Sequence, residues 1–150
     1  MGISYFEDIE LHKKEIIAEF VVDREEMVEF SRKWDPQPFH IDEEAAQKSP
    51  YGGLIAPIGY VMGMINRILT EKDQKVAGLG GLGKDNMRYG KAIRPGDNIS
   101  VTIEYLHKRE SQSMPEIGIV QCAAEAKNQN DETVLTFEAT FMAAMRPRQK

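Results

Sequence analysis

The chain has 150 residues, of which 41% are hydrophobic and 29% are charged, and its formal net charge is −5. This length predicts a single domain over residues 1–150 that can bury a core without a disulfide or a metal ion. The negative charge disfavours a general nucleic-acid binder, but it leaves room for a small anionic ligand at a local basic patch.

Cys122 is the single cysteine, so an intrachain disulfide is excluded and a reducing, cytoplasmic setting is expected. Its apolar neighbours in the run Val120–Ala124 predict a small buried hydrophobic side chain rather than a nucleophile. The N-terminal residues lack the basic segment of a targeting signal, and no window holds 18 apolar residues. We therefore expect no membrane association.

The first elements are a strand followed by a helix. Residues 15–22 are rich in β-branched side chains and predict a strand. Asp23 and Glu26 then have the spacing of a capping box, which predicts a helix over about residues 24–32. Asp42 is a second N-cap candidate, for a short helix that ends near Lys48.

Between these helices lies the segment Trp34–Asp42, which holds Pro36 and Pro38. Each proline pushes the residue before it toward an extended conformation, so a stiff, irregular loop is expected. The loop carries Asp35 and His40. In a straight polyproline conformation these two would lie roughly 15 Å apart, so the chain must turn after Pro38 if both act on one molecule. The alternative is that both residues serve only as caps of a turn and of the next helix.

The most apolar segment begins at Pro57, a residue tolerated at the start of a helix. Apolar side chains recur at helical spacing at Ile58, Val61, Met62, Ile65, Ile68 and Leu69. The opposite side also holds Gly59, Tyr60 and Gly63, so little of the surface is polar. We expect a long central helix that is buried on most sides.

The second half of the chain predicts strands. They cover about residues 86–93, 99–105, 117–127 and 133–145, with turns at 94–97 and 128–131. Short turns between consecutive strands indicate an antiparallel sheet, hence an α+β fold. A curled sheet of this kind can wrap the long helix, which is the hotdog architecture. Its open edges predict a homodimer.

Other motifs point away from several chemistries. The run Gly78–Gly83 satisfies the dinucleotide-binding pattern, but it follows a helix and leads into strands, so a glycine-rich, bulged strand is favoured. His12, His40 and His107 lack metal-ligand spacing, so no metal site is expected. The chain also lacks the nucleophile elbow of serine hydrolases.

Two stretches resemble the MaoC-like dehydratases, the (R)-specific enoyl-CoA hydratases of hotdog fold. The first is Trp34–Ala46, with the core Asp35-x-x-Pro38-x-His40, followed by Tyr51–Ala56. The second comprises Ile93–Asp97 and Val134–Thr140. The similarity extends over nearly the whole chain from about Phe6.

The resemblance implies that Asp35 and His40 hold and activate a water molecule. The implied reaction is reversible syn addition of water to a trans-2-enoyl-CoA, which gives an (R)-3-hydroxyacyl-CoA, with coenzyme A only as part of the substrate. A carboxylate and an imidazole can together take one proton and return another. The developing negative charge on the thioester oxygen needs donors, which the N-terminus of a helix supplies.

The chain departs from the family pattern at the donor side. Gln37 stands where the family commonly has asparagine, and Pro57-Ile58 replaces the usual His-Gly or Ser-Gly. Because proline has no N–H, Ile58 and Gly59 become the expected oxyanion donors, with Gln37 and Tyr60 as further substrate-binding candidates. This departure motivates one alternative, a weakly active or non-catalytic acyl-CoA-binding subunit. A separate alternative is a hotdog acyl-CoA thioesterase. Arg88, Lys91 and Arg94 are candidates for contacting coenzyme A phosphates, although solvated strand ends are the simpler interpretation.

Overall fold

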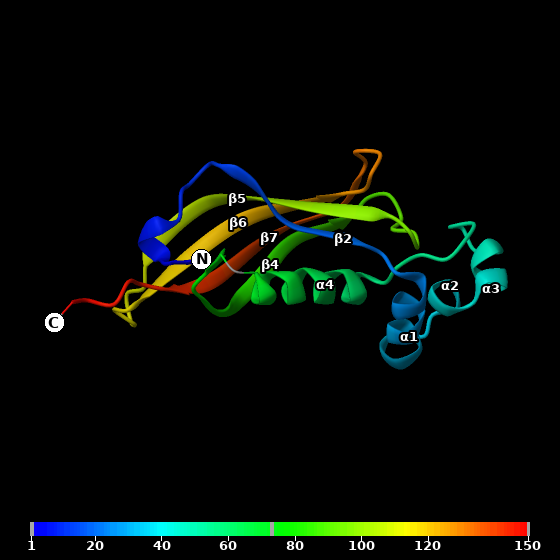
Figure 1. Cartoon of the computed structure of the whole chain (residues 1–150), viewed down its shortest axis with the longest axis horizontal. Coiled ribbons are helices and arrows are strands. Elements are labelled where there is room, and N and C mark those ends of the chain that lie inside the picture. Colours follow the sequence, from blue (N-terminus) through cyan, green and yellow to red (C-terminus); the bar gives the residue numbers. More distant parts are fainter. Residues whose placement is uncertain (1, 73, 150) are drawn as a thin grey trace.

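The computed structural model describes residues 2–72 and 74–149. Its main feature is a five-stranded antiparallel sheet in the order β2-β5-β6-β7-β4. The strands are β2 (Lys14–Val21), β4 (Gly78–Tyr89), β5 (Asn98–Glu110), β6 (Ile117–Lys127) and β7 (Thr133–Ala144). The longest helix, α4 (Ile58–Glu71), lies along one face of this sheet (Figure 1). The α+β class with an antiparallel sheet is thus confirmed.

Alternating burial explains how the sheet forms the core. In β6 every second residue from Gly118 to Ala126 is buried, and the residues between them are half-buried. The buried members other than Gly118 belong to the hydrophobic core together with Ile99 and Val101 of β5, and all of these are at most 7% exposed. Cys122 is one of these buried residues, as predicted, and burial raises the pKa of its thiol.

Three short helices gather at one end of the sheet, beyond the N-terminus of α4 (Figure 1). They are α1 (Arg24–Trp34), α2 (Pro38–Ile41) and α3 (Glu43–Gln47). The two predicted caps are confirmed, because Asp23 accepts from the Glu26 amide at 2.8 Å and Asp42 accepts from the Ala45 amide at 3.1 Å. This end of the molecule holds Asp35 and His40.

The N-terminal segment lies at the opposite end of the sheet, near the C-terminus (Figure 1). A short strand, β1 (Gly2–Ser4), pairs in parallel with β3 (Gln74–Val76), and a 3-10 turn, η1 (Phe6–Asp8), follows β1. Phe6 and Ile9 are buried in the core there. The sequence does not predict this small parallel pair, because its strands are too short to show a period.

One predicted strand boundary and one predicted connection are wrong. The strand expected from residue 86 begins at Gly78, and irregular register with β7 shows that the glycine-rich run is the bulged strand that the sequence favoured. The turn at 94–97 is not a hairpin, because β4 lies at one edge of the sheet and β5 pairs with β2 near the other. The connection from β4 to β5 therefore crosses the end of the sheet, where it meets the helical cluster.

The edge strand β4 is the least covered part of the sheet. Eleven of its 12 residues are exposed, and the exception is Met87. Leu79, Leu82 and Tyr89 are 53%, 54% and 67% exposed. None of the helices within residues 2–72 and 74–149 has both the length and the apolar character needed to cross a membrane.

Candidate active site

Asp35 and His40 are brought together by a turn between α1 and α2. Asp35 ends α1, where its amide donates to the Ser31 carbonyl at 2.9 Å. Gln37 is extended, as expected before a proline, and Pro38 opens α2 at the first helical position. Part of the segment predicted as irregular is therefore helical, and the turn after Pro38 that the two side chains require is present.

The two side chains face each other closely. The Oδ2 atom of Asp35 lies 3.5 Å from the Nε2 atom of His40. The Asp35 side chain is 43% exposed, whereas that of His40 is only 8% exposed. The pair thus has one buried member and one member open to solvent, so a small molecule can reach it from the Asp35 side.

The other nitrogen of His40 has a fixed role. Its Nδ1 atom lies 2.7 Å from the carbonyl oxygen of Ile55. A carbonyl only accepts, so Nδ1 carries the proton of this hydrogen bond. In the neutral ring, Nε2 then presents a lone pair toward Asp35. The ring of Phe39 packs edge-on against the imidazole, with centroids 4.6 Å apart, and so limits its rotation.

The start of α4 holds the two amides that were predicted to donate to an oxyanion. Pro57 is the N-cap, and its carbonyl accepts from the amides of Tyr60 and Val61 at 3.1 and 3.3 Å. Within the described residues, the amides of Ile58 and Gly59 have no backbone acceptor. Ile58 follows Ile55 by three residues, which places their Cα atoms within about 11 Å of each other. The free amides therefore lie near the residue that holds His40.

The two further substrate-binding candidates differ. Gln37 is exposed, and its side chain makes no cap hydrogen bond. Tyr60 is buried, and its hydroxyl donates to the Glu26 carboxylate at 2.7 Å. Burial, and after it this hydrogen bond, raise the pKa of Tyr60, so the phenol keeps its proton. In this structure Tyr60 connects α4 to α1.

The three basic candidates do not form one cluster. Arg88 lines a shallow hollow on the sheet together with Glu125 and Glu138. The Lys91 ammonium lies 3.6 Å from the Glu132 carboxylate. Arg94 donates to the backbone carbonyls of residues in the loop before α4. Arg94 was considered in the sequence analysis only as a phosphate contact, because sequence alone does not reveal backbone acceptors.

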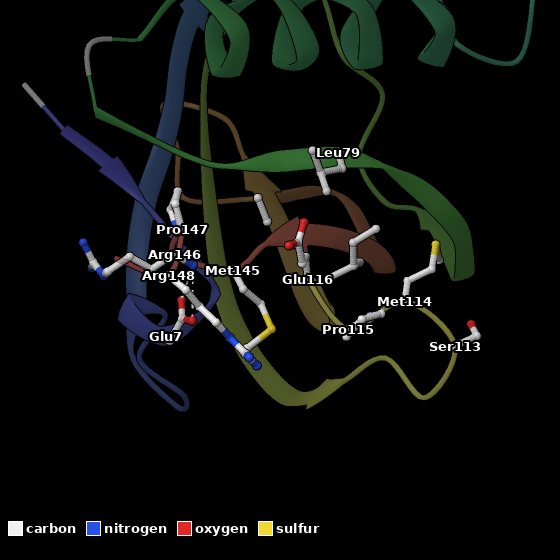
Figure 2. Close-up of a pocket in the computed structure, with 12 residues that line it drawn as sticks. Glu7, Leu79, Ser113, Met114, Pro115, Glu116, Met145, Arg146, Pro147 and Arg148 are labelled. Atoms are coloured by element: carbon white, nitrogen blue, oxygen red, sulfur yellow. Dashed lines mark hydrogen bonds between the residues drawn. The ribbon is translucent and has the colours of Figure 1, made fainter. Parts of the chain in front are cut away.

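A second hollow of about 840 Å³ lies at the opposite end of the sheet (Figure 2). Its walls include Leu79 of β4, Met114 of the loop before β6, and Arg146 and Arg148 of the C-terminal segment. Arg146 is held there by Asp8, and its amide donates to the Glu7 carboxylate. None of the predicted site residues lines this hollow.

Comparison with known proteins supports the assignment of the family. The sequence model of the family described as "MaoC like domain" matches residues 10–127. The chain belongs to this family. A MaoC-like dehydratase from Rhodospirillum rubrum has a similar structure, with a TM-score of 0.88 and 32% sequence identity. The similarity covers 97% of this chain and 99% of that one.

Two further proteins are similar to this chain. The R-hydratase PhaJ1 from Pseudomonas aeruginosa is 22% identical, with a TM-score of 0.76 and coverage of 95% of this chain and 86% of that one, and it shows the same fold. The uncharacterized protein YdeM from Bacillus subtilis is 26% identical over 125 residues, which are 81% of this chain and 85% of YdeM. The family model thus supports the MaoC-like assignment from the sequence, and the similar solved structures support the hotdog fold.

Proposed function

We propose that this MaoC-like protein is a hydratase/dehydratase that adds water reversibly to a trans-2-enoyl-CoA and gives an (R)-3-hydroxyacyl-CoA. The observation that carries the proposal is the Asp35–His40 pair, with 3.5 Å between Oδ2 and Nε2. Family membership and an R-hydratase of the same fold support it. The resemblance to the family implies an acyl-CoA substrate, and this substrate is part of the proposal.

The pair suits the binding of a water molecule. With Nδ1 donating to Ile55, the Asp35 carboxylate and the Nε2 lone pair are both acceptors. Two acceptors do not bond each other, but the two protons of one water molecule satisfy both. The oxygen of that water then has a lone pair free to attack an electrophile.

The reaction requires two proton transfers and one C–O bond. The water oxygen bonds to C3 of the enoyl group, and one member of the pair takes the proton that the water loses. The same member then passes this proton to C2, on the same face of the double bond, while the other member keeps its hydrogen bond to the oxygen. The Nδ1 hydrogen bond restricts the part of His40 in either transfer to Nε2.

The thioester oxygen becomes negative as C3 is attacked. The free amides of Ile58 and Gly59 at the start of α4 are the proposed donors, and the positive end of the helix dipole adds to their effect. Pro57 itself has no N–H to offer. Exposed Gly59 lets a thioester approach the backbone closely, whereas half-buried Ile58 narrows the approach beside it.

The test is the loss of the ultraviolet absorption of crotonyl-CoA and longer enoyl-CoA substrates. Asp35→Asn and His40→Ala are each expected to lower kcat by about 100-fold or more, because each removes a proton-transfer partner. Asp42→Asn is the matched control, since asparagine also caps α3. Wild-type rates in both site variants would contradict the mechanism.

The same preparations separate the two alternatives. Binding of an acyl-CoA in a titration without any turnover would favour a non-catalytic subunit, which the Pro57-Ile58 departure motivates. Release of free thiol from a saturated acyl-CoA, detected with a thiol-reactive dye, would favour a thioesterase.

We further propose a homodimer in which the β4 edges of two chains pair. The support is the exposed edge strand with Leu79 and Leu82, together with Gly59 and Gly63 exposed four residues apart on α4. In such a dimer α4 is covered as the central helix of a hotdog unit. Leu82→Glu is expected to shift the mass measured by light scattering to that of one chain, and Leu11→Glu, at an exposed site near β2, is the control.

A further inference from the structure

Arg94 lies in the connection that crosses the end of the sheet from β4 to β5. It follows buried Ile93 and begins the turn Arg94–Asp97. Its amide donates to the Asp97 carboxylate at 2.8 Å, and the Asp97 amide donates back to the Arg94 carbonyl at 3.1 Å. Asp97 also accepts from the Gln129 side chain at 3.0 Å. The backbone of Arg94 is therefore fixed from two elements.

The guanidinium group of Arg94 points into the loop that precedes α4. Its Nη1 atom donates to the carbonyls of Gly53 and Leu54, at 3.0 and 3.4 Å, and its Nη2 atom donates to the carbonyl of Tyr51. Gly53 leaves room for this group, because a Cβ added there would lie 3.2 Å from Nη1. One side chain thus holds three carbonyls within four residues.

The loop has few other anchors before Leu54. Residues 50–52 are exposed, and Gly52 has a φ of 68°. Tyr51 makes one ring contact, with Phe39, and the amides of Tyr51 and Gly52 donate to Ser49. The chain is next fixed by buried Leu54, by the Ile55 amide, which donates to the Phe39 carbonyl, and by the Ala56 amide, which donates to the Ile93 carbonyl. Because the Leu54 carbonyl is one of its acceptors, the guanidinium group acts on the peptide that leads into Ile55.

Ile55 is the residue whose carbonyl holds the Nδ1–H of His40. We propose that Arg94 is a positioning residue that keeps His40 in the Nδ1–H tautomer by fixing this loop. The proposal deepens the proposed function, and its catalytic consequence rests on that function. The tautomer itself is a property of the folded protein, whatever the reaction is.

The alternative tautomer has a clear chemical consequence. If the Ile55 carbonyl moves away, Nδ1–H loses its acceptor, and the neutral ring gains by placing its proton on Nε2. An Nε2–H group donates to the Asp35 carboxylate 3.5 Å away in a charge-assisted hydrogen bond. Asp35 and His40 then bond each other, and the two acceptors that hold a water molecule are lost.

Lysine cannot replace arginine in this role. A guanidinium group is a planar fork whose two terminal nitrogens reach carbonyls several ångströms apart, whereas an ammonium is a single point. Arg94→Lys keeps the charge and is expected to keep the fold, but it leaves part of the loop unbonded. Arg94→Gln removes the charge and most of the donors.

The test is nitrogen NMR of His40 in full-length protein with isotope-labelled histidine, with the signals assigned by comparison with His40→Gln. In the neutral ring of the wild type, Nδ1 is expected to carry the proton and Nε2 to be unprotonated. Arg94→Lys and Arg94→Gln are expected to move population to the Nε2–H form. Lys108→Gln is the control, because it removes a cation that also bonds backbone carbonyls but lies at the opposite end of the sheet.

Kinetics provide a second measurement on the same variants. Arg94→Lys is expected to lower kcat about 10- to 100-fold, because the reacting groups are misplaced. KM is expected to stay within about twofold, because the change affects the reacting pair and not substrate binding. Added guanidinium, at concentrations far below those that denature, should restore part of the activity of Arg94→Ala.

The two measurements keep the proposals distinct. A wild-type tautomer in both Arg94→Lys and Arg94→Gln would overturn the role of Arg94, even in a working hydratase. Absence of turnover in the wild-type protein would instead overturn the proposed function, and the NMR comparison alone would then decide the role of Arg94.

Discussion

Each end of the sheet has one cation that bonds the backbone of a segment lying across it. At the active-site end, Arg94 holds the carbonyls of Tyr51, Gly53 and Leu54. At the other end, the ammonium of Lys108 donates to the carbonyls of Phe6, Glu7 and Ile9, at 3.0, 3.4 and 2.9 Å. The two arrangements have the same number of acceptors.

The segments that they hold are different. The segment bound by Lys108 is also anchored by buried Phe6 and Ile9, and the ammonium lies 5.0 Å from the centre of the Phe6 ring. The loop bound by Arg94 offers only exposed or half-buried residues until Leu54. Where apolar burial fixes a segment, the cation adds stability. Where burial is absent, the cation determines geometry, and the catalytic pair depends on it.

The largest stability effect is expected at the Lys108 end, from Gly118→Ala. An added Cβ would lie 2.0 Å from Cδ2 of Phe6, so the ring must leave its buried position. We expect a loss of about 3 kcal/mol in the free energy of unfolding, measured by urea denaturation. The active-site end should keep its kcat at temperatures where the variant is folded. A stability within error of wild type would show that the ring is not needed there.

A smaller loss is expected from Lys108→Met. This change removes one charged donor from three carbonyls while keeping most of the apolar stem, and we expect roughly 1–2 kcal/mol of destabilisation. Lys108→Arg should recover much of it, since the ring of Phe6 also accepts a guanidinium. The rate of enoyl-CoA hydration should not change in either variant. A fall in kcat that matches that of Arg94→Lys would remove the distinction between the two ends.

Two buried tyrosines extend the comparison to alkaline pH. Burial raises the pKa of both Tyr60 and Tyr105 above the ordinary value of 10.0. Above about pH 10 the unfolded chain releases phenolic protons that the folded chain keeps. The contribution of these two tyrosines to the free energy of unfolding is therefore constant below this pH and falls above it. Urea denaturation of Tyr60→Phe and Tyr105→Phe should show a smaller alkaline loss in each.

The same variants should differ at neutral pH. Tyr60→Phe removes the hydrogen bond to Glu26 and is expected to cost about 1 kcal/mol. Among the described residues no side chain is bonded to the Tyr105 hydroxyl and no buried side-chain oxygen is unpaired, so this hydroxyl reaches solvent and Tyr105→Phe should cost less than that. Equal losses at neutral pH would indicate that the Tyr60–Glu26 bond contributes little to joining α1 and α4.

The smallest effect on stability is expected from Gly53→Ala at the active-site end. The added Cβ would be 3.2 Å from Nη1 of Arg94, so the guanidinium must shift by a few tenths of an ångström. We expect less than about 1 kcal/mol of destabilisation but a several-fold fall in kcat, measured by the loss of enoyl-CoA absorption. Gly2→Ala, whose Cβ would meet nothing within 4 Å, is the control.

Much of this fold follows from short-range patterns in the sequence. The alternation in residues 117–127 predicts β6 with its limits, and the apolar spacing from Ile58 onward predicts the start of α4, because each element buries one regular face. The expected burial of this helix on most sides is not confirmed, since Gly59 and Gly63 are exposed. The prolines alone left open whether Asp35 and His40 meet, and their proximity was expected only from the resemblance to the family. Their roles remain a prediction, as do those of Ile58, Gly59 and Gln37.

The errors arose where contacts are distant in sequence. The turn at 94–97 reads as a hairpin, yet its strands pair with β7 and β2. Arg94 donates hydrogen bonds to carbonyls that are 40 to 43 residues earlier in the chain, and backbone acceptors have no sequence signature. For the same reason the sequence does not reveal that the Tyr60 hydroxyl donates to Glu26, 34 residues earlier, and a contact of Tyr60 with substrate stays a prediction.

The single cysteine allows the local opening of the sheet to be measured by thiol labelling. Cys122 is 7% exposed and lies between β5 and β7, paired with Tyr105 and Ala139. A thiol reagent can reach it only after these strands separate, so the rate of labelling under native conditions measures the free energy of that opening. Because no second thiol is present, the signal comes from one known position at the centre of the sheet.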